Sequence, residues 1–188
     1  KDFGLGQSFD IFMPNQKTGI VPNKKWKKEK IGESWYAGET LISAIGQGFV
    51  LTNPFQLAVM TSIIASNGKL IEPTIIKGNG VNFKTNNKYS KEIKIIKKAM
   101  FQVVNENKGT AFKSRLESIK FAGKTGTSQV RRISLSERES DDFREKEQEW
   151  KNRDHALFVG YMPYDDPKYA ISVIIEHGGS GASTAAPI

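Results

Sequence analysis

Apolar residues along the chain recur first at helical spacing and later at strand spacing. The first helical pattern opens at Asn53, which can cap a helix, and Pro54, which suits a first helical turn. Gln56 stands three residues after the cap, as in a capping box, and Asn67-Gly68 predicts the C-terminal end. Apolar side chains cover most faces of this segment, which predicts a buried helix; they are Phe55, Leu57, Val59, Met60, Ile63 and Ile64.

A second helix is predicted from a cap at Ser90 to about Asn107, with Gly109 just beyond its end. Its lysines lie opposite an apolar stripe, as in an amphipathic helix packed on a core. The stripe consists of Ile93, Ile96, Met100, Val103 and Val104. By contrast, residues 1–30 are rich in turns and predict irregular structure with short extended pieces.

Strand patterns occupy most of the remaining chain. Residues 119–130, 155–161 and 169–175 predict three strands, and the turn-rich link between the last two is compatible with an antiparallel hairpin. A short C-terminal helix is expected after residues 178–181. The fold class that these elements predict is α/β in the broad sense (α+β), with a mainly antiparallel sheet packed against helices.

Residues 131–154, between the first two strands, are polar almost throughout. They hold seven Arg and Lys against eight Asp and Glu, and their few apolar residues form no wide stripe. We expect an exposed, charged excursion beside the candidate site, either a solvated insert or an element that docks a partner.

The length of 188 residues suits one domain or a large piece of one. The sequence does not begin with Met, and we expect both of its ends to be cut from a longer protein. No apolar run approaches the ~18 residues needed to cross a bilayer, so a membrane anchor is expected upstream if there is one. Cys is absent, which excludes disulfides and thiolate metal sites.

The net charge of +8 comes largely from two clusters, residues 24–30 and 91–98. We interpret both as solvated faces, the second being the wet face of the predicted amphipathic helix. The alternative is a non-catalytic basic module that binds phosphates or anionic lipid headgroups, with Trp26 available to stack. No nucleic-acid-binding motif accompanies either cluster, so we expect no nucleic-acid partner.

The strongest candidate for chemistry is the tetrapeptide Lys124-Thr125-Gly126-Thr127, inside the first predicted strand. An edge strand has backbone N–H groups free to stabilise the oxyanion that forms when a serine attacks an amide. Gly126 lets a substrate approach the backbone, and Lys124 supplies a positive charge. The hydroxyls of Thr125 and Thr127 can hold a substrate carboxylate.

Other groups of candidate residues give weaker evidence for a functional site. Gly123-Lys124-Thr125 matches only the end of a P-loop, because position 118 is Ser where that motif needs Gly. His155 begins a predicted strand and His177 ends one, so both are expected to be surface or strand-cap residues. Two histidines without Cys do not predict a zinc site, and no Gly-x-Ser-x-Gly supports a Ser–His–Asp triad.

Seven segments in order carry a family resemblance. They are Trp35-Tyr-Ala-Gly-Glu-Thr40, Ala44-Ile-Gly-Gln-Gly-Phe49, Thr52-Asn-Pro-Phe-Gln-Leu57, Asn67-Gly-Lys69, Gly109-Thr-Ala111, Gly123-Lys-Thr-Gly-Thr-Ser-Gln-Val130 and His177-Gly-Gly-Ser-Gly181. The series resembles the C-terminal half of the transpeptidase domain of the penicillin-binding protein 2 family, the elongation-specific class B enzymes. The resemblance covers nearly the whole of residues 1–188, with 131–154 the least diagnostic part.

The resemblance implies a penicillin-binding, β-lactamase-like transpeptidase fold that is incomplete in this chain. Enzymes of the family acylate a serine with the D-alanyl-D-alanine end of a peptidoglycan stem peptide, and an amine of a neighbouring stem then forms the cross-link. β-Lactams mimic the donor peptide, and no cofactor is needed. By position, the resemblance makes Lys124 and Thr127 catalytic and assigns substrate binding to Thr125, Gly126 and Thr127. The candidate rim of the site consists of Gly46, Gln47, Gly48, Gly178 and Gly179.

The resemblance also implies a setting for the protein. The expected partners are a membrane glycan polymerase and scaffold proteins of the elongation machinery. The expected location is the periplasmic face of the inner membrane, held by an upstream anchor. A D,D-carboxypeptidase or a serine β-lactamase of the same fold remains an alternative, in which water replaces the acceptor amine.

The nucleophilic serine of the family is not expected in this chain. Ser66-Asn67-Gly68-Lys69 matches Ser-x-x-Lys, but the Asn-Gly pair predicts the end of a helix. Acylation of a serine by this motif needs the Ser at the start of a helix, with the Lys one turn later. Ser8-Phe9-Asp10 and Ser140-Asp141-Asp142 match the Ser-x-Asn/Asp motif that the family also carries, but we interpret both as ordinary turn or loop residues. We therefore expect this chain to be inactive alone and to self-associate through exposed apolar faces.

Overall fold

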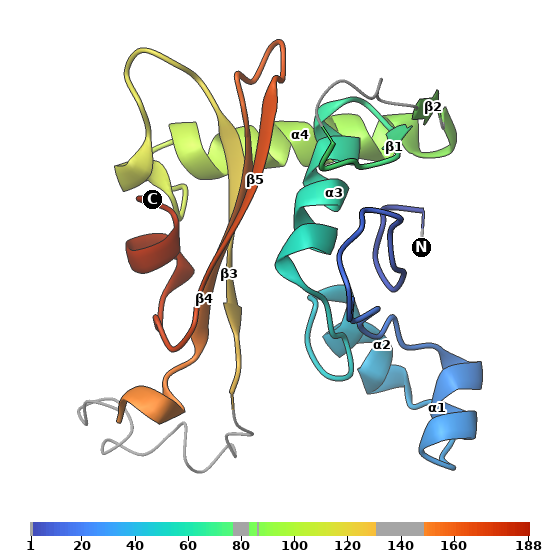
Figure 1. Cartoon of the computed structure of the whole chain (residues 1–188). Helices are drawn as coiled ribbons and strands as arrows, with labels where there is room; N and C mark the ends of the chain where they lie inside the picture. The colour runs from blue at the N-terminus through green and yellow to red at the C-terminus, as the bar shows by residue number, and fades with distance from the viewer. Residues whose placement is uncertain (1, 77–82, 86, 131–148) are drawn as a thin grey trace. The chain divides into compact units, whose positions relative to one another are not determined.

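The computed structural model describes residues 2–76, 83–85, 87–130 and 149–188 and divides into two compact units. Unit 1 is Lys1–Ile96 and unit 2 is Lys97–Ile188. Unit 1 contains α1 (Lys24–Lys30), α2 (Ala37–Ala44), α3 (Pro54–Ala65), β1 (Lys69–Ile71), β2 (Phe83–Thr85) and the 3₁₀ turn η1 (Asn87–Tyr89). Helix α4 (Ser90–Asn105) begins in unit 1 and ends in unit 2 (Figure 1).

Helix α3 confirms the first predicted helix, including its cap and its burial. The side chain of Asn53 accepts a hydrogen bond from the Gln56 N–H at 2.9 Å. The predicted capping box is wrong, because the Gln56 side chain does not reach back to the cap. The Gln56 side chain is fully buried and donates to the carbonyls of Gln7 and Thr18 at 2.7 and 2.9 Å, because a buried amide needs hydrogen-bond partners.

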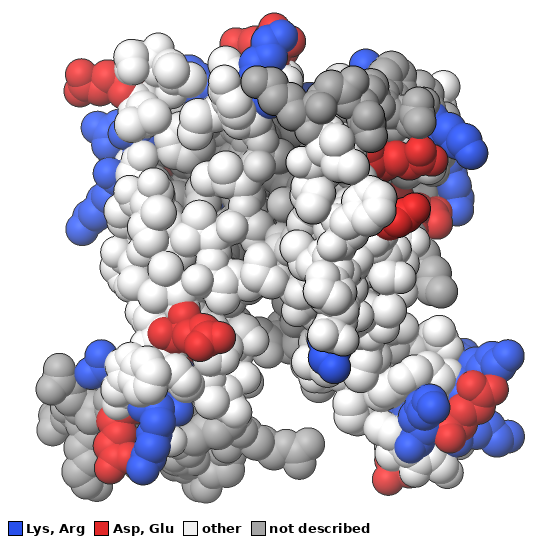
Figure 2. Space-filling model, in the orientation of Figure 1, with Lys and Arg blue, Asp and Glu red and all other residues white. Residues whose placement is uncertain are grey.

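Helix α1 corrects the expectation that residues 1–30 are irregular. Asn23 caps it by accepting from the Trp26 N–H at 2.9 Å. Most of its lysines are exposed, and Figure 2 shows basic side chains gathered over α1. Lys27 is the exception to the predicted solvated face: it is 1% exposed, with its ammonium 2.6 Å from Glu39 and 3.4 Å from Glu33.

Helix α4 begins at Ser90, as predicted, and ends at Asn105, two residues before the expected end. Its apolar stripe is confirmed at Ile93, Met100 and Val104, all of which are buried. Ile96 is the error, since it is 40% exposed. The lysines of residues 91–98 lie on half-buried or exposed positions, as expected of a solvated face.

Unit 2 is built on a three-stranded antiparallel sheet, which confirms the predicted fold class and the hairpin. The strand order is β3-β4-β5, with β3 at Ala122–Ser128, β4 at His155–Met162 and β5 at Tyr169–Ile175. Strand β3 is shorter at both ends than the predicted 119–130. The sheet is accompanied by 3₁₀ turns η2 (Phe112–Ser114) and η3 (Trp150–Asn152) and by a π-helical turn η4 (Gly181–Ala185) where a C-terminal helix was expected.

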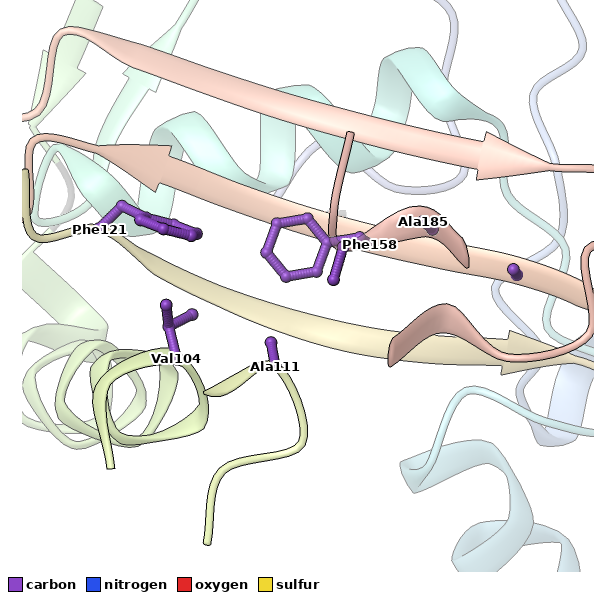
Figure 3. Close-up of a cluster of buried hydrophobic side chains, with 7 residues drawn as sticks. Val104, Ala111, Phe121, Phe158 and Ala185 are labelled. Carbon is purple, nitrogen blue, oxygen red and sulfur yellow. The ribbon is translucent and has the colours of Figure 1, made fainter. Parts of the chain in front are cut away.

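The core of unit 2 lies on one face of this sheet. Side chains from α4, the loop after it, the strands and η4 converge there (Figure 3). The labelled members are Val104, Ala111, Phe121, Phe158 and Ala185, each no more than 6% exposed. Of the predicted charged excursion, residues 131–148 lie outside the described residues.

Candidate functional site

The tetrapeptide Lys124-Thr125-Gly126-Thr127 lies in β3, which confirms its predicted position on a strand. Among the described strands, β3 pairs only with β4, so it is an edge strand of its sheet. Along such a strand every second backbone N–H points away from the sheet. The outer edge of β3 is therefore a row of donors of the kind that an oxyanion site needs.

The side chains of the tetrapeptide divide between the two faces of the sheet. Thr125 lies directly opposite the buried Phe158 of β4, and directly opposite residues share a face. Because side chains alternate along a strand, Thr127 shares this core-side face and Lys124 lies on the other. Lys124 and Thr127 are exposed, and the Lys124 ammonium donates to the Thr125 carbonyl.

Glycines allow other groups to pack closely against this strand. A Cβ placed on Gly123 would lie 2.2 Å from the ring of Phe158, and one on Gly181 of η4 would lie 2.3 Å from the Gly126 carbonyl oxygen. The η4 turn therefore rests on the backbone of β3 at the middle of the tetrapeptide. This close packing fixes Gly126 from the core side, while its outer edge has no strand partner among the described residues.

The candidate rim residues Gly178 and Gly179 lie beside the same strands. A Cβ on Gly178 would lie 3.1 Å from the Cβ of Ala156, and Ala156 is directly opposite Thr127. The Gly179 N–H donates to the Asp154 carbonyl at 2.8 Å. Gly179 has φ of +77°, which favours glycine because a Cβ is strained there. The structure thus brings these two rim residues next to the tetrapeptide.

The other candidate rim residues belong to unit 1. Gly46, Gln47 and Gly48 follow α2, where the Gly46 N–H donates to the Ser43 carbonyl at 3.0 Å and the Gln47 N–H to the Ile42 carbonyl at 3.1 Å. Both glycines have positive φ, +75° and +73°. These residues form a tight turn, and their role in a site stays a prediction.

Two histidines that were expected to be surface or strand-cap residues contact each other. The His177 N–H donates to His155 Nδ1 at 2.9 Å, and the ring centroids lie 4.8 Å apart. The ring of Trp150 lies 4.4 Å from that of His177. Sequence reasoning missed this pairing, because nothing local relates positions 22 residues apart. Within the described ranges, no three His, Asp or Glu side chains are grouped as a metal site requires.

The serine of the single Ser-x-x-Lys string is engaged elsewhere. Ser66 follows the last residue of α3, and its hydroxyl donates to the Ser62 carbonyl at 2.7 Å. Lys69 lies in β1. A serine at the end of a helix with its proton bonded to the preceding turn is a structural residue, as expected. Ser8 is an exposed residue of unit 1, and residues 140–142 lie outside the described part of the chain.

Comparison with known families decides what this edge strand belongs to. The sequence model described as the penicillin binding protein transpeptidase domain matches residues 1–188. The chain belongs to this family. The predicted resemblance and the predicted fold are thereby confirmed.

Relatives of the transpeptidase family place the chain near penicillin-binding protein 2. It is 34% identical over 202 residues to the peptidoglycan D,D-transpeptidase MrdA of Acinetobacter baumannii, covering 100% of this chain and 29% of that protein. The identity to MrdA of Haemophilus influenzae is 34% over 200 residues, covering 100% and 30%. The chain therefore spans less than a third of the length of these curated relatives.

Solved structures agree with this placement. The complex between penicillin-binding protein PBP2 and MreC from Helicobacter pylori matches with a TM-score of 0.83 and 36% identity, over 96% of this chain and 31% of that one. Pseudomonas aeruginosa PBP2 in complex with WCK 5153 matches with a TM-score of 0.78 and 33% identity, over 99% and 40%.

Proposed function

We propose that this chain supplies the strand that carries the Lys-Thr-Gly motif of a serine D,D-transpeptidase that cross-links peptidoglycan during cell elongation. The observation that carries the proposal is the position of Lys124-Thr125-Gly126-Thr127 on the edge strand of the sheet, in a transpeptidase domain. The relatives with which the chain aligns over its whole length are named peptidoglycan D,D-transpeptidases, which supports the reaction class.

In the proposed reaction, a serine oxygen attacks the carbonyl carbon of the penultimate D-alanine of a stem peptide. Negative charge then develops on the carbonyl oxygen, and the Thr127 N–H stabilises it as a backbone donor. The C–N bond breaks, D-alanine leaves with a proton, and the serine is left as an ester. An amine of a neighbouring stem attacks this ester, which forms the cross-link and regenerates the serine.

Substrate binding in this proposal falls to the hydroxyls of Thr125 and Thr127, which hold the terminal carboxylate. Gly126 admits the donor peptide close to the strand, and the charge of Lys124 stabilises anionic groups near the nucleophile. β-Lactams carry a carboxylate and a reactive amide in a similar arrangement, so the same groups would bind them. No cofactor enters any of these steps.

We place the nucleophile in a part of the protein outside this sequence, so that the chain alone is inactive. The engagement of Ser66 in a helix end supports this placement. A part of the protein outside this sequence is also where we place a membrane anchor, with this domain on the periplasmic face of the inner membrane. Within the described residues, no helix has the length and apolar character to cross a bilayer.

The partners that we propose are a scaffold protein of the elongation machinery and a membrane glycan polymerase. The first is supported by the Helicobacter pylori PBP2 structure, which is a complex with MreC. The second rests on the family resemblance.

The test is covalent labelling by a penicillin, read by intact mass. We expect one adduct on the full-length protein and none on the 188-residue chain. In the full-length protein, Lys124→Ala should slow acylation by about 100-fold, the size of effect typical for removal of one electrostatic contact to developing charge. Lys120→Ala, which removes an exposed lysine just before the strand, is the matched control and should change the rate less than about twofold.

The outcomes separate the alternatives. Labelling of the short chain would mean that a serine of this sequence reacts. A full-length protein that is never acylated would contradict the proposed function. Release of D-alanine from a labelled pentapeptide without cross-linked product would favour a D,D-carboxypeptidase of the same fold.

A further inference from the structure

A threonine outside the tetrapeptide Lys124-Thr125-Gly126-Thr127 contacts the tetrapeptide directly. The hydroxyl oxygen of Thr110 lies 2.8 Å from that of Thr125, a hydrogen bond in which either group can be the donor. Thr110 lies in the loop that follows α4, fifteen residues before its partner. This contact is a side-chain hydrogen bond to a residue of the proposed carboxylate site.

The loop that carries Thr110 is closely packed on both sides of it. A Cβ on Gly109 would lie 2.2 Å from the Val103 carbonyl oxygen, so only glycine fits there without a shift of the backbone. The Ala111 N–H donates to the same carbonyl at 3.0 Å, and Ala111 is 1% exposed in the core cluster. Thr110 therefore stands between two residues that are anchored to the end of α4, while its own side chain is exposed.

The proton of this hydrogen bond can be assigned when a carboxylate is bound. A threonine hydroxyl donates one hydrogen bond and accepts up to two. If Thr125 donated to Thr110, it would present only lone pairs to a carboxylate, and the two would repel. If Thr110 donates, the Thr125 oxygen is satisfied as an acceptor and its own proton is available for the anion. A hydrogen bond to an ionised group is stronger than a neutral one, so the bound carboxylate selects the second arrangement.

We propose that Thr110 is a positioning residue, which holds the hydroxyl of Thr125 as a hydrogen-bond donor for the free carboxylate of the donor peptide or β-lactam. This inference rests on the proposed function, because it assigns the ligand of that same site. It makes Thr110 a determinant of specificity for substrates with a free carboxylate over analogues in which that group is blocked.

The experiment compares benzylpenicillin with its methyl ester, which lacks the anionic carboxylate, on the full-length protein. The quantity measured is the second-order acylation rate constant, followed by intact mass. Thr110→Val removes the hydroxyl at constant shape and should slow acylation by benzylpenicillin about tenfold, in the range for loss of support to a hydrogen bond with a charged group. The ester should lose less than about twofold in the same variant, because it offers no carboxylate to hold.

Two further variants and a control sharpen the result. Thr110→Ser keeps the hydroxyl and should remain within about twofold of the unmodified protein, and Thr110→Cys, a weaker donor of similar size, should fall between Ser and Val. In a double-mutant cycle, Thr110→Val should add little to Thr125→Val, since the two groups act as one. Thr74→Val, at an exposed threonine of unit 1, should change neither rate.

Equal losses for both β-lactams, or no rescue by serine, would overturn the proposal and leave Thr110 as a structural residue only. An unchanged rate for Thr110→Val would overturn it as well. If Thr110→Val does not fold, the acylation rates of Thr110→Ser and Thr110→Cys with benzylpenicillin test the proposal. A slower cysteine variant supports it, and equal rates overturn it. A full-length protein that no penicillin acylates would instead contradict the proposed function itself, so the two failures are distinguishable.

Discussion

The two units of the chain treat their apolar side chains differently. In unit 2, the sheet residues Ala156 and Phe158 are at most 2% exposed and belong to a core that also includes α4 and η4. In unit 1, α2 buries none of its residues, and the side chains of Leu41 and Ile45 on and just after it are 74% and 76% exposed. The core of unit 2 is closed over these side chains, whereas unit 1, although it buries α3, leaves an apolar face of α2 open.

The difference indicates how the candidate site is supported. The edge strand β3 stands on a packed base whose members all belong to unit 2, so contacts inside that unit support its geometry. Large exposed apolar side chains that lie four residues apart, as Leu41 and Ile45 do, are of the kind that mark association surfaces when they belong to a contiguous patch. Opening the core of unit 2 should lower the stability of the protein, whereas polar substitutions on the open face of α2 should change self-association and leave stability almost unchanged.

The largest effect is expected from Phe158→Ala. The ring of Phe158 is 2% exposed and fills the space left by Gly123 and Gly160. Its removal leaves a cavity under the tetrapeptide and should lower the free energy of unfolding by about 3–5 kcal/mol. Chemical denaturation of the full-length protein measures this loss. Tyr169→Ala, an aromatic of the neighbouring strand that is 69% exposed, should change stability by less than about 1 kcal/mol. Equal losses in both variants would contradict the closed core.

Helix α3 of unit 1, helix α4 and the three strands of unit 2 could be predicted from the sequence, because their signals are local. Asn53 and Pro54 predict the start of helix α3. The spacing of apolar residues predicts the amphipathic stripe of α4 and the three strands. The tetrapeptide on β3 was found as a motif and lies where a strand was expected. These predictions need only neighbours within a few residues.

The features that sequence reasoning missed depend on distant partners. Lys27 is buried because Glu39, twelve residues later, neutralises it, and a lysine-rich segment gives no sign of this. Gln56 binds the carbonyls of Gln7 and Thr18 in preference to the helix cap, since tertiary contacts there outweigh the local option. Thr110 forms its hydrogen bond with Thr125 only because α4 and the loop that follows it pack on the sheet. Each of these three features concerns a polar group whose partner is set by the fold.

A smaller effect, dependent on pH, is expected from Glu39→Gln in unit 1. Burial opposes the charge of Lys27, but its hydrogen bonds to Glu39 and Glu33 outweigh this and raise its pKa. The hydrogen bond from Lys27, followed by that from the Tyr36 N–H, lowers the pKa of Glu39 below its ordinary 4.5. Because the folded pKa of Glu39 lies below its unfolded value, the stabilisation is present above pH 4.5 and is lost as the pH falls through the folded pKa.

Thermal unfolding of the full-length protein between pH 3 and 9 tests this prediction. The difference in Tm between the unmodified protein and Glu39→Gln should be largest near neutral pH and shrink as the pH falls below 4.5. On the alkaline side it should persist up to pH 9, because the raised pKa of Lys27 keeps its contribution fully present below its ordinary 10.5. Glu29→Gln, from an exposed pair with Lys25 at 3.8 Å, should show almost no difference at any pH. A pH-independent effect of Glu39→Gln would rule out the charge pair as its cause.

A gain of stability is expected from Tyr161→Phe. Tyr161 is 1% exposed, and within the described residues its hydroxyl has no hydrogen-bond partner. Burial, and then the neighbouring Tyr164, raise the pKa of this hydroxyl, which keeps it neutral but does not satisfy it. Replacing it by hydrogen removes an unpaired polar group and should raise the free energy of unfolding by up to about 1 kcal/mol. Tyr164→Phe, at a half-buried position, is the control and should be close to neutral. A clear loss in Tyr161→Phe would show that the hydroxyl is satisfied in solution.

The smallest effect on stability is expected from Leu41→Ser combined with Ile45→Ser, and it is the most direct test of the open face. Both side chains are already largely in water, so the free energy of unfolding should change by no more than about 0.5 kcal/mol. The 188-residue chain should nevertheless lose much of its self-association, because apolar patches of this kind drive association. Sedimentation velocity measures this loss, with Leu116→Ser, at a 44% exposed leucine of unit 2, as the control. If the unmodified chain already sediments as a single monomer, the face of α2 does not mediate association. The exposed apolar side chains of unit 1 would then have no more effect on association in solution than those of unit 2.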